Sequence, residues 1–219
     1  MSEKSIGAIS GPKTMLRKSF YILLPVCFIF LSCRNETSYF DTVTEEINGI
    51  KILPADTFSQ GEGIIGLVRI PEMNCLVLKD TSSGRKIKND FARSLQTLLE
   101  EYNLCNESAT SDMPGTIIHS NDTAFFVYEV FIPMKEKPKR LLSSPCIWKK
   151  IPGCVAVLCH HKGPYEYLFI SYGKLREYLE EHQLMQEGPM REIYFTDPTQ
   201  ETDSSKWITK IYVPVVYRK

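Results

Sequence analysis

Two stretches of the chain carry apolar residues at the spacing of an amphipathic helix. The first, residues 91–104, has them at Phe91, Leu95, Leu98, Leu99 and Tyr102. The second, residues 171–184, has them at Tyr172, Leu175, Tyr178 and Leu179. Side chains three or four positions apart lie on the same face of a helix. The pattern therefore predicts two helices, each with one face packed on a core.

Short apolar runs around each predicted helix predict β-strands. In the first half they cover residues 75–78, 116–118 and 126–133, and in the second half residues 154–157, 191–196 and 207–214. Proline at 133 and 214 suits a strand end, because proline cannot donate to the hydrogen-bond ladder of a sheet. Both halves thus have the order strand–helix–strand–strand.

The halves also repeat one another at a nearly constant spacing. The separations are 79 residues for Cys75 and Cys154, 80 for Phe91 and Ser171, and 81 for Phe126 and Trp207. We therefore predict a duplicated unit, at residues 73–134 and 152–215. The predicted fold is α+β, with the units joined in one antiparallel sheet, helices on one face and a groove between the units. Residues 135–150, with six basic side chains, are predicted to be a solvated connector.

The N-terminus has the pattern of an export signal. Basic residues at 13, 17 and 18 precede an apolar run that ends at Leu31-Ser-Cys33, which is too short to cross a bilayer comfortably. We predict a lipoprotein leader over residues 1–33 with lipidation at Cys33, so that the mature protein is anchored in the cell envelope. Residues 1–14 would be a start-site extension before Met15, and residues 34–69 a tether and entry segment. An uncleaved signal anchor and simple secretion are the alternatives.

Composition and motifs narrow the function. Lys plus Arg and Asp plus Glu each number 26, so the chain has no overall attraction to nucleic acid. The cysteines after Cys33 are odd in number and lack CxxC spacing, which predicts neither a disulfide framework nor a zinc site. His160 and His161 are adjacent, and on a strand they would point to opposite faces. We therefore expect no metal site. We also expect no cofactor and a monomeric protein.

Alternation in the last predicted strands separates two faces of the sheet. We expect the helices to cover the face with Tyr128, Val130, Ile132, Thr209, Ile211 and Val213. We assign the opposite face Glu129, Phe131, Glu192, Tyr194, Lys210 and Tyr212. Aromatic rings and carboxylates together suit a planar cation, although Lys210 opposes one. The alternative is a water-exposed sheet face with a weak Glu129–Lys210 salt bridge.

Several short motifs occur in a fixed order in this frame. They are His161-Lys-Gly-Pro-Tyr165, Gly188-Pro189, Glu192-Ile-Tyr194, Asp197-Pro198 and Ile211-Tyr-Val-Pro-Val215. Residues 70–216 thereby resemble the GyrI-like family, the effector-binding domain of AraC- and MerR-type regulators. The resemblance implies two strand–helix–strand–strand units with a groove that binds small molecules, often lipophilic cations, against aromatic residues and an acid. Some members are described as hydrolases.

Our first hypothesis is a membrane-tethered protein that binds a small amphipathic or cationic molecule in this groove. The candidate ligand-binding residues are Glu129, Phe131, Tyr165, Glu192, Tyr194, Lys210 and Tyr212. The second hypothesis is an enzyme in which Glu192 or Glu129 is the general base and Tyr165 or Tyr194 orients water. The third is a module that grips a protein segment.

Overall fold

The computed structural model describes residues 46–47, 50–54, 65–83, 86–105, 113–121 and 125–217. The predicted leader with Cys33, and residues 34–45 of the predicted tether, lie outside these ranges. At the start of the described part, β1 (Glu46–Ile47) and β2 (Ile50–Lys51) form a separate two-stranded sheet.

The remaining described strands form one sheet, which is antiparallel except where β3 pairs with β4. In spatial order they are β3 (Leu53–Pro54), β4 (Ile65–Ile70), β9 (Cys154–Lys162), β12 (Ile208–Tyr217), β11 (Met190–Tyr194), β6 (Gly115–Asn121), β7 (Phe126–Pro133), β5 (Met73–Ser82) and β8 (Ile147–Ile151). The short β10 (Leu184–Gln186) also pairs with β12. The α+β class is confirmed.

Each half of the domain contains one long helix. The chain order is β5, α1 (Ile87–Leu104), β6 and β7 in the first half, and β9, α2 (Leu168–Glu181), β11 and β12 in the second, with β10 inserted after α2. A 3-10 turn over Tyr165–Tyr167 leads into α2. β6 pairs with β11 and joins the halves. The order strand–helix–strand–strand is as predicted, whereas descent from a duplication stays a prediction.

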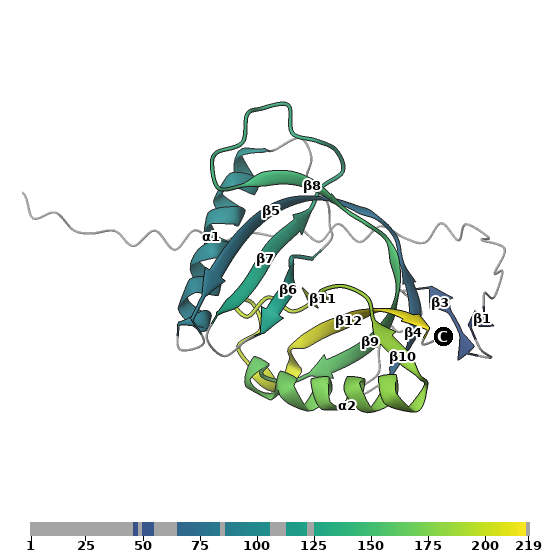
Figure 1. Ribbon diagram of the computed structural model, residues 1–219. Coiled ribbons are helices and arrows are strands. Elements are labelled where there is room, and N and C mark those ends of the chain that lie inside the picture. Colours follow the sequence, from purple (N-terminus) through teal and green to yellow (C-terminus); the bar gives the residue numbers. More distant parts are fainter. Residues whose placement is uncertain are drawn as a thin grey trace, which may run out of the picture. The chain divides into compact units, whose positions relative to one another are not determined.

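Both helices cover the same face of the sheet. Leu98 of α1 packs in one core with Leu76, Tyr128 and Val130. Leu175 of α2 packs in another with Val157, Ile211 and Val213. Figure 1 shows α1 against β5 and β7, and α2 along β9 and β10. The predicted helix-facing residues of the last strands are confirmed.

Apolar side chains also fill much of the opposite face. One cluster there belongs to the second half and contains Val68, Leu158 and Tyr212. Another belongs to the first half and contains Val77, Ile117 and Phe131. Ile193 of β11 packs against both clusters. The opposite face is therefore largely buried, and the alternative of a water-exposed sheet face is wrong for these residues.

The predicted solvated connector, residues 135–150, is only partly a loop. Its last residues form β8, which pairs with β5, and Lys149 forms an ion pair with the buried Glu129 at 2.7 Å. The basic residues in Trp148-Lys-Lys-Ile151 concealed this strand. The second predicted helix also starts three residues earlier, at Leu168, and Leu184 lies in β10 instead.

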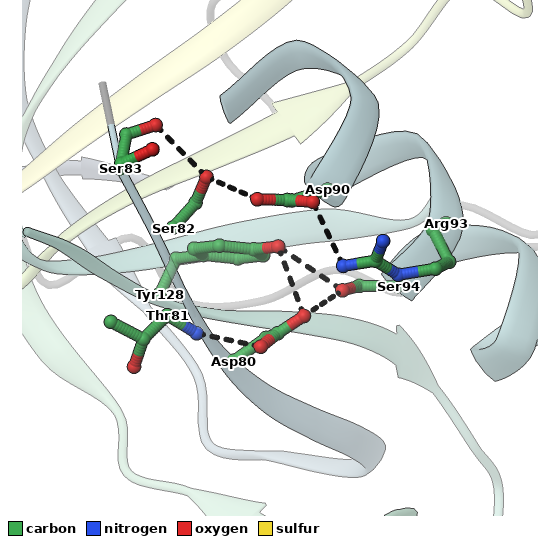
Figure 2. Close-up of polar contacts among 8 residues, drawn as sticks. All are labelled: Asp80, Thr81, Ser82, Ser83, Asp90, Arg93, Ser94 and Tyr128. Atoms are coloured by element: carbon green, nitrogen blue, oxygen red, sulfur yellow. Dashed lines mark hydrogen bonds and ion pairs between the residues drawn. The ribbon is translucent and has the colours of Figure 1, made fainter. Parts of the chain in front are cut away.

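Polar side chains fasten α1 to β5 and β7, as Figure 2 shows. Ser94 of α1 donates to the Asp80 carboxylate at 2.7 Å and lies 3.1 Å from the Tyr128 hydroxyl. Near the start of α1, the Ser82 hydroxyl donates to Asp90 at 2.6 Å and lowers the pKa of that carboxyl. These contacts compensate for an N-cap residue, Lys86, that makes no side-chain cap.

We predict that Ser94→Ala lowers the free energy of unfolding by about 1–3 kcal/mol, since it removes the buried donor to Asp80 and leaves the Tyr128 hydroxyl with its longer contact to Asp80, at 3.4 Å. Denaturant unfolding of the variant measures this. Ser83→Ala, at an exposed position whose backbone oxygen alone enters the network, is the matched control and should change stability by less than about 0.5 kcal/mol. Equal effects of the two changes would contradict the assigned role of Ser94.

Candidate functional site

Glu192 is a buried carboxylate at the junction of the two halves. It lies on β11, opposite Ile211 of β12 on one side and Thr116 of β6 on the other. Paired residues of adjacent strands point to the same face, so Glu192 lies on the helix-covered face. It is 4% exposed.

This placement corrects the predicted face. Glu192 and Tyr194 lie under the helices, whereas Glu129, Phe131, Lys210 and Tyr212 lie on the opposite face. The predicted alternation of side chains along β11 is correct, but the predicted assignment of its two faces is wrong. Glu192 and Tyr194 were expected on the face away from the helices, whereas the pairing of Glu192 with Ile211 places both on the helix-covered face.

Two tyrosines hold the Glu192 carboxylate. The Tyr172 hydroxyl of α2 donates to Oε1, and the Tyr194 hydroxyl donates to Oε2 at 2.7 Å. Thr116 Oγ1 lies 2.9 Å from the Tyr194 oxygen. Burial raises the pKa of Glu192, and the two tyrosine hydrogen bonds oppose this rise. Both oxygens of the Glu192 carboxyl group thus accept hydrogen bonds in a site that is buried from solvent.

Aromatic rings from both halves surround this group. Tyr194 meets Tyr165 edge-on at 5.6 Å between ring centres, and Phe91 of α1 at 5.8 Å. Trp207 lies 4.8 Å from Tyr165, and burial raises the pKa of Tyr165 to about 12. The structure therefore brings together three of the predicted site residues: Tyr165, Glu192 and Tyr194.

Sequence reasoning missed Tyr172, Phe91 and Trp207 as members of this site. Tyr172 and Phe91 were assigned to the apolar faces of their helices, which is correct as far as packing goes. The available signal was chemical: a buried tyrosine hydroxyl needs a hydrogen-bond partner, and the nearby motif supplies a glutamate.

His161 positions the start of α2. Its Nε2 lies 3.2 Å from the Pro164 carbonyl oxygen, and its Nδ1 lies 3.0 Å from Ser171 Oγ. A carbonyl oxygen only accepts, so Nε2 donates to Pro164, and Nδ1 shares a hydrogen bond with the Ser171 hydroxyl. Pro164 precedes Tyr165 and Ser171 precedes Tyr172, so these two hydrogen bonds of His161 help to position two aromatic residues of the site.

A pocket of about 290 Å³ opens beside the carboxylate, between the two halves. The first half contributes Ile118, His119 and Ser120, and the second half contributes Tyr172, Leu175, Arg176, Leu179, Gln186, Met190 and Val213. Tyr172 thus lines the pocket and also donates to Glu192. The pocket lies between the units, where the sequence predicted a groove.

None of the seven predicted site residues lines this pocket, and four of them lie away from Glu192. Glu129 accepts from Lys149 and lies 3.1 Å from His119 Nε2. The ammonium of Lys210 lies 4.5 Å from the ring centre of Phe195. Phe131 and Tyr212 are buried in the apolar clusters of the opposite face. These four residues make up a different environment from that of Glu192.

Within the described ranges, no three His, Cys, Asp or Glu side chains are grouped so that they could hold a metal ion. Neither of the two α-helices in the described part of the chain is long and apolar enough to cross a bilayer.

Solved structures show the same fold. The C-terminal domain of EcmrR has a TM-score of 0.64 and 22% identity, covering 71% of this chain and 99% of that domain. A hydrolase from Listeria innocua has a TM-score of 0.53 and 14% identity, over 73% and 95%. SAV2435 bound to tetraphenylphosphonium has a TM-score of 0.50 and 15% identity, over 70% and 94%.

The sequence comparisons give the family. Among curated proteins, none is similar enough to this chain to count as a relative. The model of the GyrI-like small molecule binding domain matches residues 65–216, which is more than half of the 219 residues. The chain therefore belongs to the GyrI-like family of small-molecule-binding domains.

Proposed function

We propose that the protein binds a small amphipathic cation in the pocket between β6 and α2. The observation that carries this proposal is the position of Tyr172, which lines the pocket and donates to the buried Glu192 carboxylate. A rotation of this one side chain would open the carboxylate to a ligand in the pocket. The charge of the ligand would then take the place of the tyrosine hydroxyl.

The pocket walls suit an apolar or aromatic body. Ile118, Leu175, Leu179, Met190 and Val213 supply apolar surface. Its volume of about 290 Å³ is near the lower end of the range for ligand sites in proteins. A compact molecule fits this space, and His119, Ser120, Arg176 and Gln186 supply polar groups in its lining.

The Glu192 carboxylate would favour a delocalised positive charge in the pocket, whereas Arg176, which lines the pocket, opposes one. Burial weakens the screening between charges, and it raises the pKa of Glu192 because the ionised form is poorly solvated there. A bulky cation sheds its water easily and would relieve that cost. Tyr172, the aromatic residue that lines the pocket, adds cation–π attraction. SAV2435, which shares the fold, was solved with tetraphenylphosphonium.

We predict that tetraphenylphosphonium raises the Tm of the wild-type protein, by the equivalent of about 2.7 kcal/mol at a hundred times Kd. Glu192→Gln should weaken binding about 30-fold or more, because it removes one partner of a buried charge pair. Isothermal titration calorimetry measures both affinities.

Glu129→Gln is the matched control for this prediction. Glu129 is as buried as Glu192, at 5% exposed, but lies on the opposite face of the sheet. Its replacement should leave the affinity for tetraphenylphosphonium within about threefold of wild type, since Glu129 does not line the pocket and contacts it only through His119. If the two variants lose affinity alike, the ligand does not use the Glu192 side of the sheet.

The raised pKa of Glu192 predicts opposite pH dependences for stability and binding. The pKa of Glu192 in the folded protein lies above its ordinary value of 4.5. The stabilisation that comes from protonated Glu192 is therefore complete at pH values below 4.5. It is lost as pH rises through the folded pKa. Cation affinity should rise over the same range, because ionised Glu192 is the binding form. Tm and Kd measured against pH test this, and Glu192→Gln should flatten both curves.

Hydrolysis of a reactive small molecule is a second candidate function. A glutamate with a raised pKa is a suitable general base near neutral pH, and a hydrolase from Listeria innocua shares the fold. Incubation of the protein with an electrophilic epoxide, followed by chromatography, separates the two functions. Recovery of the unchanged compound favours binding alone, and product formed by wild type but not by Glu192→Gln favours catalysis.

We further propose that a lipid on Cys33 anchors the domain in the cell envelope, as the basic and apolar pattern before that cysteine suggests. Cys33→Ser should release the protein from the membrane fraction of a bacterial host, whereas Cys27→Ser, a cysteine within the same apolar run, should not. Membrane retention of Cys33→Ser would exclude lipidation as the anchor.

A further inference from the structure

Arg191 places a buried guanidinium on the face of the sheet opposite the helices. It precedes Glu192 on β11, so its side chain points the other way. It pairs with Tyr212 of β12 and Ile117 of β6, and it is 5% exposed. Nη2 donates to the Pro152 carbonyl at 3.0 Å. Nε and Nη1 are buried and have no hydrogen-bond partner.

A guanidinium cannot escape this situation by losing its proton, since it stays charged at any ordinary pH. An unpaired charge in a protein interior is costly, and such charges are normally paired. Glu129 is the nearest buried carboxylate in the sheet pairing, two strands away through Ile117. It is engaged by Lys149 and His119. The guanidinium of Arg191 therefore needs another hydrogen-bond acceptor, one that carries negative charge.

Other nitrogen groups lie near Arg191 on this face. Lys210 is a diagonal neighbour of Arg191, because it lies two residues before Tyr212 on β12. His160 pairs with Lys210 across β9, is buried, and has no hydrogen-bond partner at Nε2. Among the described residues of this face, the buried acid Glu129 is already engaged by Lys149 and His119. The two buried donors of Arg191 that have no partner are the feature that indicates an anion site.

We propose that this face of the sheet holds a small oxyanion, of the carboxylate or phosphate class, bound to Nε and Nη1 of Arg191. This site is separate from the pocket beside Glu192 and does not depend on the cation proposal. Because the guanidinium is enclosed by both halves of the sheet, the anion would stabilise the folded domain.

The test is thermal unfolding of the full 219-residue chain in mild detergent, with phosphate or acetate added at constant ionic strength against chloride. We expect a saturable rise in Tm of about 3–6 °C at ten times Kd. Saturation separates binding from the general stabilisation that some salts cause. A rise with phosphate alone or with acetate alone identifies the class, and no saturable rise with either overturns the proposal.

Two variants locate the effect. Arg191→Gln should abolish the saturable rise, whereas Arg176→Gln, at the rim of the other pocket, should keep it. Loss in Arg176→Gln, or persistence in Arg191→Gln, would place the anion elsewhere and overturn the proposal. If Arg191→Gln does not fold, calorimetric titration of the wild-type and Arg176→Gln proteins with the active anion decides. Both should bind one anion per chain, and no binding, or binding lost with Arg176, refutes the site.

Discussion

The pairing of β6 with β11 is the contact on which the rest of the structure depends. It places Glu192 beside Thr116 and Ile193 beside Gly115, and it brings the two halves together around one pocket. The junction also requires close approach. A side chain at Gly115 would collide with the Glu192 backbone oxygen and the Phe131 ring, so only glycine allows β6 and β11 to pair this closely. Without the junction, each half would expose an open sheet edge.

Much of this arrangement could be predicted from particular residues. Apolar spacing located both long helices, and alternation in the last strands identified the residues beneath them, such as Val130 and Ile211. The phase of β11 could not be predicted, because its residues alternate between polar and apolar types that suit either face. Only the register with Ile211 decides it. β8 was missed because two lysines interrupt a run of only five residues.

The two buried carboxylates of the sheet show how environment sets role. Glu129 meets an ammonium and an imidazole, so its charge is matched within the protein. The described hydrogen-bond donors to Glu192 are the neutral hydroxyls of Tyr172 and Tyr194, which solvate a carboxylate without neutralising it. This difference is the basis of the proposal that Glu192 binds a cationic ligand. Sequence alone does not distinguish them, since both are glutamates in the middle of strands.

Successive residues of β11 serve opposite sides of the sheet, with Arg191 on one and Glu192 on the other. In such a strand, a register shift of one residue moves every side chain to the other face of the sheet. Deleting one residue just before Met190 would turn the guanidinium to the helix-covered face and turn the carboxylate, together with Tyr194, to the opposite face. The length of the chain before β11 is therefore as important to both environments as the side chains of the strand itself.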